Sequence, residues 1–438
     1  MSTETIDLKS QLISDFYDRE KALNGEAQSS FHKTKRQAFE RFDALGFPTP
    51  KHEEWKYSNV KNLIARSYQF EGNHSVTAET IAPYLIPNLT GNILFFINGT
   101  YDADLSSIVS PKDELSVMTL REATNTLPDV VAEHFGKADS QNEAFTALNT
   151  AFAAEGLFVH VPEGKTVEQP VIIYCINDAR KENIGAQPRN LFVVEKNAEV
   201  KVTEIFQTLG ESHSLTNAVT EIFVGEDARV QYYKVQNDSQ QSYHVGTTHV
   251  QVKDRGNFYA ATVSLNGSFI RNNLNIAIDG EFCEIFMYGL YFPDGKQHID
   301  NHTVADHQKP NSQSNELYKG VLRGKSTGVF NGKIFVREDA QKTNAFQSCK
   351  NVVLSREATM NTKPQLEIFA DDVKCSHGTT TGQLDDEALF YLRSRGISKP
   401  EAMSLLMFAF CEDVISQIKI EAIGDYLEGI ITQKLTQA

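Results

Sequence analysis

The sequence contains few cysteines and no two cysteines in a C-x-x-C spacing. Among 438 residues there are only five, and they stand singly at Cys175, Cys283, Cys349, Cys375 and Cys411. A disulfide framework normally uses an even set, and a structural zinc or iron–sulfur site takes roughly four ligands from one chain. The sequence therefore excludes a self-contained cysteine cluster of that kind and predicts free thiols.

Basic residues and long hydrophobic runs are also scarce. Lysine and arginine total 42 against 57 acidic residues, which gives a net charge of −15. A nucleic-acid or anionic-membrane binder needs a basic face, and a transmembrane helix needs about 20 apolar residues. The start, MSTETIDLKSQLISDF, lacks the basic and apolar parts of a secretion signal. We expect a cytoplasmic protein that binds neither nucleic acid nor membrane.

A complete nucleotide-binding loop is missing as well. The segment from Gly320 to Ser326 contains Gly324-Lys325-Ser326, but only three residues separate its glycines where the phosphate loop has four. The sequence that follows is typical of a strand, whereas the phosphate loop opens a helix. We therefore predict that this chain does not itself hydrolyse ATP.

What the sequence does contain is helical patterning at both ends. An apolar stripe at four-residue spacing predicts a helical region over residues 1–92, with Leu8, Leu12 and Phe16 on one face. Residues 381–438 are again helical in pattern, and Ser398-Lys399-Pro400-Glu401 has the form of a capping box. We expect Gly424 to break the apolar stripe formed by Met403, Leu406, Phe410, Val414 and Ile418. We expect a last helix that contains Leu427, Ile431 and Leu435.

Residues 93–380 are dominated by strand patterns. In Ile270–Asp279, apolar and polar residues alternate, which is typical of a half-buried strand. A turn residue, a small residue, any residue and an apolar residue recur, beginning at Asn197, Asp227, Arg255, Asp279 and Asn331. Turns that recur every 24–30 residues favour a β-solenoid. A β-sandwich or barrel is the alternative on this pattern.

Three histidines lie close together in QHIDNHTVADHQKP. His298, His302 and His307 are interspersed with Asp300 and Asp306. Imidazole and carboxylate groups together can bind a transition metal. Polar loops and the polar face of a solenoid also have this composition, so the segment has either a metal-binding or a structural polar role.

A cysteine and a histidine stand two residues apart in DVKCSHGTTTG. If this segment is a strand, Cys375 and His377 point to the same face. A thiolate beside an imidazole can hold a soft or borderline metal such as iron or zinc, and an imidazolium lowers a thiol pKa. Two ligands are too few for a tight site. The pair is therefore either structural or part of a site that takes further ligands from elsewhere.

The longest recognisable stretch is AQKTNAFQSCKNVVLSREATMNTKPQLEIFADDVKCSHGTTTGQLDDEALFYLRSRGIS, residues 340–398. Together with NHTVADH and GFPTPKHEEWKYSN, it resembles the SufB/SufD family of iron–sulfur cluster assembly proteins. The resemblance is to the SufD branch, because SufB-type chains carry a His-Glu-Ala sequence where this chain has His377-Gly378-Thr379.

This resemblance implies a mainly β fold, a right-handed parallel β-helix (solenoid) core with N-terminal and C-terminal α-helical segments. It also implies a non-catalytic scaffold that pairs with a SufB paralogue and binds a SufC-type ABC ATPase. His377 and Cys375 would contribute ligands for transient iron or a nascent cluster at the SufB interface. No cofactor would be tightly bound in the isolated chain. Cys349 is either a third ligand or a small core residue.

The resemblance also places the ATPase on the C-terminal helices. The residues expected to bind it are Leu384, Leu389, Phe390, Leu392, Arg393, Arg395, Ile397, Met403, Leu406 and Phe410. An exposed strand edge or helix stripe would favour a homodimer when SufB is absent. The competing hypothesis is an enzyme on a β-helix or cupin-like fold, either polysaccharide-acting or a metal-dependent oxygenase that uses His298 to His307.

Overall fold

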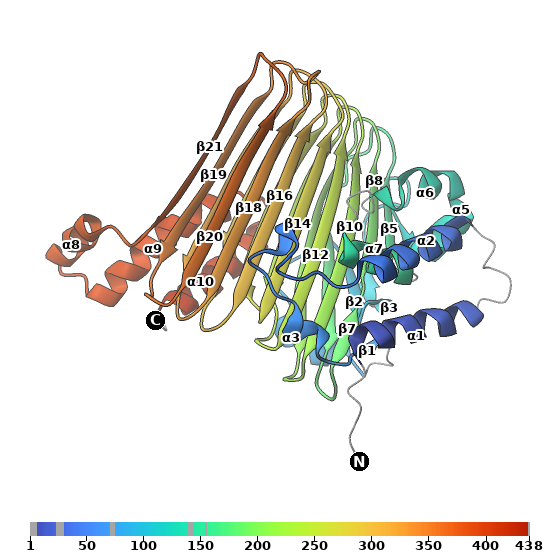
Figure 1. Ribbon diagram of the computed structural model, residues 1–438, viewed down its shortest axis with the longest axis horizontal. Coiled ribbons are helices and arrows are strands. Elements are labelled where there is room, and N and C mark those ends of the chain that lie inside the picture. The colour runs from blue at the N-terminus through green and yellow to red at the C-terminus, as the bar shows by residue number, and fades with distance from the viewer. Residues whose placement is uncertain (1–6, 23–29, 71–74, 138–142, 154–155, 437–438) are drawn as a thin grey trace.

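Two β-sheets, parallel except for the antiparallel pairs β2–β3 and β4–β5, form the centre of the molecule (Figure 1). The structure is a computed structural model that describes residues 7–22, 30–70, 75–137, 143–153 and 156–436. Residues 1–6 lie outside these ranges. They belong to the N-terminal stretch from which we expect no secretion signal. Sheet A runs in the order β20-β18-β16-β14-β12-β10-β8-β5-β4, and sheet B in the order β21-β19-β17-β15-β13-β11-β9-β6-β2-β3. This is a parallel β-solenoid of about eight turns, as predicted, and not a sandwich or barrel.

From β9 onward the strands are long and similar in length, between 8 and 11 residues, whereas several earlier strands are shorter. Sheet A contains β1 (Gln69–Phe70), β4 (Ser116–Thr119), β5 (Leu157–Val161), β7 (Ile184–Ala186), β8 (Arg189–Val194), β10 (Ser214–Val224), β12 (Ser242–Val252), β14 (Phe269–Ile278), β16 (His298–His307), β18 (Thr327–Val336) and β20 (Thr359–Ile368). Sheet B contains β2 (Asn92–Ile97), β3 (Thr100–Ser107), β6 (Val171–Asp178), β9 (Glu199–Leu209), β11 (Arg229–Asn237), β13 (Asn257–Asn266), β15 (Glu284–Tyr291), β17 (Gln313–Leu322), β19 (Asn344–Val353) and β21 (Lys374–Gly382).

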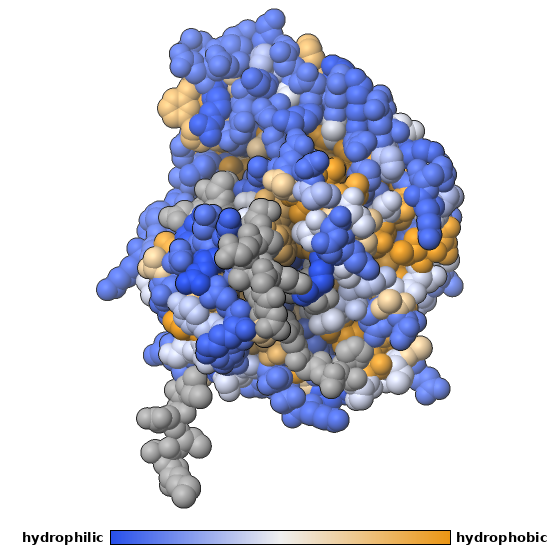
Figure 2. Space-filling model, turned by 90° about the vertical axis from the view of Figure 1, so that its right-hand side faces the viewer, coloured by the Kyte–Doolittle hydropathy of each residue, from blue (hydrophilic) through white to orange (hydrophobic). Residues whose placement is uncertain are grey.

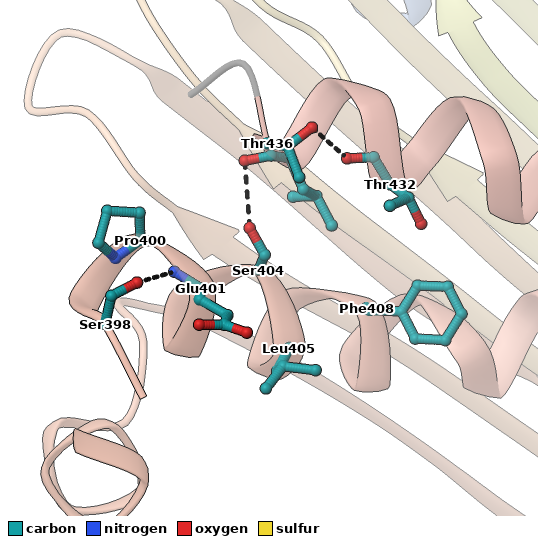
Figure 3. Close-up of a pocket in the computed structure, with 9 residues that line it drawn as sticks. Ser398, Pro400, Glu401, Ser404, Leu405, Phe408, Thr432 and Thr436 are labelled. Atoms are coloured by element: carbon teal, nitrogen blue, oxygen red, sulfur yellow. Dashed lines mark hydrogen bonds between the residues drawn. The ribbon is translucent and has the colours of Figure 1, made fainter. Parts of the chain in front are cut away.

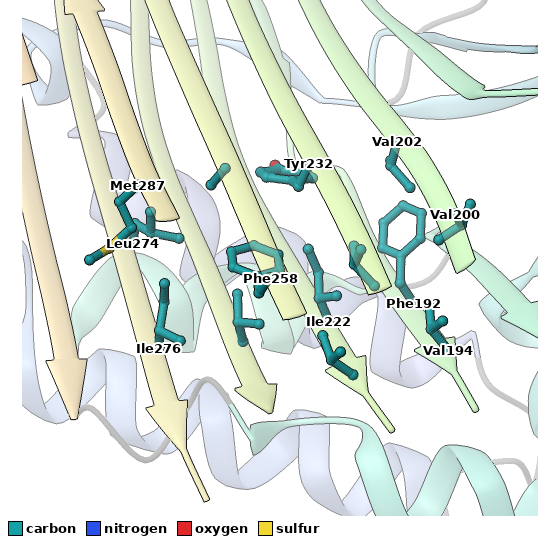
Figure 4. Close-up of a cluster of buried hydrophobic side chains, with 14 of the residues drawn as sticks. Phe192, Val194, Val200, Val202, Ile222, Tyr232, Phe258, Leu274, Ile276 and Met287 are labelled. Carbon is teal, nitrogen blue, oxygen red and sulfur yellow. The ribbon is translucent and has the colours of Figure 1, made fainter. Parts of the chain in front are cut away.

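The space between the two sheets, which we call the lumen, is packed mainly with apolar side chains (Figure 4). Phe258 of β13 and Leu274 of β14 are buried there. The period-2 prediction for Ile270–Asp279 is confirmed, because Ile270, Leu274, Ile276 and Ile278 all belong to this core. Alternate residues point outward, so each strand exposes its second face to the helices or to solvent.

One row of turns gives the solenoid its repeat. The turn residue has a positive φ at Asn197, Asp227 and Arg255, as the repeat predicts, and again at Phe282, Asn311 and Lys342. The predicted repeat units at Asp279 and Asn331 were wrong: the fourth turn residue is Phe282, and Asn331 lies inside β18. Hydrogen bonds between successive turns fix the backbone position of the repeat, so residues as different as Phe282 and Lys342 can occupy the turn position.

The N-terminal helices α1 (Leu8–Lys21), α2 (Ser30–Leu45) and α3 (Lys61–Ile64) cover part of sheet A, whereas α4 (Ala78–Ile81) packs against sheet B through Ile81. Three more helices follow between early strands: α5 (Leu120–Thr126), α6 (Pro128–His134) and α7 (Ala144–Phe152). Leu8, Leu12 and Phe16 are buried, as predicted, in a cluster that includes Tyr243 and Phe269 of sheet A. On the side shown in Figure 2, hydrophilic residues form most of the surface.

The predicted segment 1–92 thus contains β1, a short strand of sheet A, and the predicted segment 93–380 contains three helices, α5 to α7. Residue 92 is itself the first residue of β2.

Two C-terminal helices, α9 (Lys399–Ile415) and α10 (Glu421–Thr436), pack on the outer face of sheet B. The helix before them, α8 (Asp386–Ser394), lies beyond the β21 end of the solenoid and buries none of its residues (Figure 1). Ser398 caps α9, and the predicted last helix is confirmed as α10, which buries Leu427, Ile431 and Leu435. Gly424 does not break a helix, since it lies inside α10; the break falls between Ile415 and Glu421.

The buried stripe of α9 differs from the predicted one. Ala402, Met407, Cys411, Val414 and Ile415 are the residues that α9 buries. Of the predicted stripe, Val414 and Ile418 are buried, whereas Met403, Leu406 and Phe410 are only half-buried. The helix is apolar on several faces, so the contact with Leu290, Val321 and Val352 of sheet B decides which face is covered.

Candidate functional site

The last strand of the solenoid places Cys375 and His377 on its inner face. In β21, Cys375 is in register with Ala345 of β19, and His377 is in register with Gln347. Both β19 residues are buried in the lumen. The two side chains therefore share a face, as the alternation predicted. Among the described residues, no strand continues sheet A beyond β20 or sheet B beyond β21, so this end of the lumen is open.

The two side chains differ in exposure. Cys375 is half-buried against a small apolar cluster that includes Ala345 and Leu366. Burial raises the pKa of the Cys375 thiol, and a backbone hydrogen bond from Ala345 lowers it to a smaller extent. His377 is exposed. The open end thus presents one accessible imidazole beside a thiol that is partly shielded.

Cys349 lies deeper, on β19. It is buried in the lumen core, where Tyr291 and Asn351 contact its sulfur at 3.6 and 3.4 Å. Burial raises the pKa of Cys349 to about 11. Its neighbour in the terminal strand is Thr379, two residues beyond His377. Cys349 is thus a protonated thiol in the solenoid as it stands, behind the pair formed by Cys375 and His377.

The three histidines predicted as a metal or polar cluster do not converge. His298 and His302 point to the outer face of sheet A, whereas His307 points into the lumen and contacts the Ser314 hydroxyl at 2.9 Å. In the part of the chain that the structure describes, no group of three His, Cys, Asp or Glu side chains could hold a metal ion. The structural polar role is the one observed.

On the outer face, Asp300 is the centre of this polar network. Its carboxylate accepts hydrogen bonds from Ser58 at 2.5 Å and Arg271 at 2.7 Å, and lies 3.0 Å from His302 Nε2. Burial alone would raise the pKa of Asp300, but Arg271 and His302 lower it below its usual range. With Glu54 contacting His302 at 3.4 Å, the network fastens the segment around Trp55 to sheet A.

We predict that His307 makes the protein less stable in mild acid. Burial lowers the pKa of His307 to about 4. Between pH 6.5 and 4, His307 therefore stays neutral in the folded protein but binds a proton in the unfolded chain. The free energy of unfolding should fall by roughly 3 kcal/mol between pH 6.5 and 4 through this residue. The free energy of unfolding, measured with urea at several pH values in that range, should change less with pH in His307→Gln than in the unaltered protein. An equal dependence on pH in the two proteins would contradict the assignment.

The segment that resembles a phosphate loop is a turn. Gly320 belongs to β17, Gly324 lies in the connection to β18 with φ +66°, and Thr327 begins the next strand. The strand predicted after this segment is confirmed.

No helix among the described residues is long and apolar enough to cross a membrane.

The residues expected to bind the ATPase occupy two kinds of position. Phe390, Arg393 and Arg395 of the α8 region are exposed. The others are half-buried: Leu384, Leu389, Leu392, Ile397, Met403, Leu406 and Phe410. Phe410 is held by Lys319, whose ammonium lies 4.4 Å from its ring centre and donates to its carbonyl oxygen at 2.8 Å. Phe410 is therefore tied to the solenoid, whereas Phe390, Arg393 and Arg395 face outward.

A groove between α9 and α10 was not predicted. We call it the C-terminal groove; it has a volume of about 470 Å³ and is lined mainly by Pro400, Glu401, Ser404, Leu405, Phe408, Thr432 and Leu435 (Figure 3). Leu405 is 48% exposed. The apolar run from Leu405 to Phe410 could have indicated this groove. The predicted stripe contained Leu406 and Phe410 but not Leu405 and Phe408, which line the groove.

A second exposed apolar surface lies on α8. Phe390 is 75% exposed and its neighbour Tyr391 is also exposed, and both line a shallow depression with Leu392 and Leu406. The helix is capped by Asp385, whose carboxylate accepts from the backbone N–H groups of Glu387 and Ala388. The cap holds a short helix in place whose aromatic face has no cover among the described residues.

Comparison with known families matches both halves of the chain. The SufBD core domain of the SUF system for FeS cluster assembly matches residues 175–410, and the SufBD protein N-terminal region matches residues 6–173. The chain belongs to the SufBD family of iron–sulfur cluster assembly proteins. The core match contains Cys349, Cys375 and His377 and most of α9.

Full-length relatives place the chain within this family in more detail. It is 31% identical to an iron–sulfur cluster assembly SufBD family protein of Synechocystis, over 94% of this chain and 93% of that protein. It is 30% identical to the iron–sulfur cluster assembly protein SufD of Escherichia coli, over 89% and 90%. A chloroplastic protein of Arabidopsis thaliana is 28% identical over 87% and 82%. The chain is therefore a SufD homologue, which confirms the family resemblance of its sequence.

Proposed function

We propose that this SufBD family member is a non-catalytic scaffold subunit of a SufBCD-type complex in the cytoplasm. Its open end pairs with a SufB-type paralogue, and its C-terminal helices bind a SufC-type ATPase. His377 and Cys375 contribute ligands to iron or a nascent cluster at the paired interface, and the paralogue supplies the rest. The isolated chain forms a homodimer through the same end.

The observation that carries this proposal is an incomplete ligand pair at an unpaired end. His377 is exposed beside Cys375 on β21, the outermost strand of its sheet among the described residues. One imidazole and one thiol cannot complete the coordination of iron, which usually takes four or more ligands. An unpaired strand edge is also a template for another chain. Both features favour a site completed by a partner.

Exposed apolar residues support pairing at the same end. Phe369 follows β20 directly and is 59% exposed, and it contacts Phe335 with ring centres 5.2 Å apart. Ile368, the last residue of β20, is also exposed. Soluble proteins rarely leave adjoining apolar residues uncovered at a strand edge without a partner. Phe369 is thus the side chain best placed to report on pairing.

The test is to mix the chain with its SufB-type paralogue and measure mass by light scattering on a sizing column. We expect a heteromer with the intact chain and weaker pairing, by about tenfold or more, with Phe369→Asp. Val109→Asp is the matched control, because Val109 is similarly exposed, at 57%, near β3 at the opposite end of sheet B. A heteromer that is equally stable with Phe369→Asp would contradict pairing through the open end.

A further inference from the structure

Three buried oxygen-bearing side chains meet in the lumen without enough partners. Glu316 of β17, Gln347 of β19 and Thr303 of β16 are each more than nine-tenths buried. The Gln347 amide donates to Glu316 Oε2 at 2.8 Å. The Thr303 hydroxyl lies close enough to Glu316 to lower its pKa by hydrogen bonding. Among the described residues, Glu316 Oε1 and Gln347 Oε1 have no close hydrogen-bond partner. The carboxylate and the amide therefore each keep an oxygen without a donor.

No basic side chain balances the charge of Glu316. Burial raises the pKa of Glu316 to about 7, and the opposing influences come only from Thr303 and Gln347, which are both neutral. A buried carboxylate without a counter-charge costs several kcal/mol. Two other buried acids have a basic partner, since Asp300 has Arg271 and Glu221 has Arg189, whereas Asp238 resembles Glu316 in having only a neutral partner, Thr208. Glu316 is thus left to be neutralised by a proton or by a cation that is not a side chain.

The position of this group relates it to the open end. Glu316 is in register with Gln347, and Gln347 is in register with His377. Neighbouring strands are about 4.8 Å apart, so Glu316 lies two strand spacings, roughly 10 Å, behind the exposed imidazole. Across the lumen, Gly332 of β18 leaves space for the Gln347 amide, since a Cβ there would lie 2.3 Å from Gln347 Nε2. Glu316, Gln347 and His377 thus form one column, at matching positions of the neighbouring strands β17, β19 and β21.

We propose that Glu316, Gln347 and Thr303 form an inner site for a divalent transition-metal ion such as iron(II), which reaches it past His377. The carboxylate, amide and hydroxyl oxygens act as ligands, and water completes the coordination. Carboxylate and carbonyl oxygens are ordinary ligands of such ions, and an imidazole at the entrance favours a borderline metal over magnesium. The site deepens the proposed scaffold function and rests on it: the inner site would hold iron before transfer to the interface.

The test is an anaerobic titration of the full isolated chain with cobalt(II) in buffer with excess magnesium, followed by calorimetry and visible absorption. We expect one cobalt(II) bound per chain and affinity reduced at least tenfold by Glu316→Gln. Gly332→Ala, which displaces the Gln347 amide, should weaken binding in the same direction. Glu204→Gln is the matched control, because Glu204 is a lumenal carboxylate already engaged by Asn190, Thr220 and Tyr232.

The outcomes separate the inner site from the scaffold proposal. Binding that survives Glu316→Gln but is lost in His377→Ala would overturn the inner site and leave the metal at the open end. No cobalt(II) bound by the unaltered chain would also overturn it, and Glu316 would then hold only a proton. In either case, pairing with the SufB-type paralogue, measured separately, still decides the scaffold function.

Discussion

Aspartate at Leu405 or at Phe390, whichever lies on the docking surface, is expected to weaken binding of the proposed SufC-type ATPase by about 30-fold or more. Leu405 lines the C-terminal groove and Phe390 stands on α8, and both are exposed in the chain alone. Exposed apolar side chains that fill a partner's pocket typically carry 2 kcal/mol or more of binding free energy, and a buried charge in the same place removes it. Calorimetry with the purified ATPase measures the change directly.

The two substitutions also distinguish the two surfaces. If the ATPase uses the C-terminal groove, only Leu405→Asp weakens binding, whereas a dock on α8 responds only to Phe390→Asp. Phe282→Asp is a suitable control, because Phe282 is exposed on a turn of the solenoid. Unchanged affinity in both variants would place the ATPase elsewhere and remove the support for the C-terminal dock.

Point variants are preferable to removing the helices. Truncation after Gly382 would uncover Leu290, Val321 and Val352 on sheet B, which α9 and α10 bury. Roughly 1.5–3 kcal/mol of stability is lost for each such side chain exposed to water. Loss of binding in a truncated chain would then reflect misfolding. The exposed positions of Leu405 and Phe390 avoid this ambiguity, so their thermal unfolding should match that of the unaltered chain.

Replacing His377 by alanine is expected to reduce iron retained by the reconstituted SufBCD-type complex at least tenfold. His377 is the exposed member of the pair on β21, and removal of a metal ligand costs at least as much as loss of an outer hydrogen-bond partner, which is 10–100-fold. Iron content and visible absorption after anaerobic reconstitution measure the effect. The complex itself should still assemble, which sizing of the same samples checks.

The two cysteines provide graded controls for this experiment. Cys375→Ser should reduce iron by less than His377→Ala, because the Cys375 thiol is partly shielded and burial raises its pKa. Cys349→Ser should leave iron unchanged, since Cys349 is enclosed by Tyr291 and Asn351. A larger loss with Cys349→Ser than with His377→Ala would refute this order and show that the lumen opens during assembly.

Much of the fold could be predicted from local pattern. Alternation in Ile270–Asp279 and the turns at Asn197, Asp227 and Arg255 indicated stacked rungs, because the period of apolar residues and the left-handed turn residues are local properties. Phe282 was missed as a turn residue because phenylalanine rarely adopts a positive φ, and here the neighbouring turns impose it. The same reasoning failed for Asn331, which is a strand residue.

The candidate site was predictable only in part. The spacing of Cys375 and His377 placed them on one face, and the structure adds that this face belongs to an open end. Chain proximity suggested that His298, His302 and His307 act together, but odd and even positions of a strand point in opposite directions, so the last faces the lumen. The column from Glu316 to His377 joins residues about 30 positions apart and has no local signal.

By itself, the sequence determined the solenoid, the helical ends, the family and the placement of Cys375 and His377 on one face of a strand. Each of these depends on spacing within one segment. Only the tertiary structure decided which face of α9 is buried, which thiol is accessible and where a buried carboxylate lacks a counter-charge. These properties depend on side chains brought together from different turns of the solenoid. Burial and charge compensation are sums over those neighbours, which no single segment specifies.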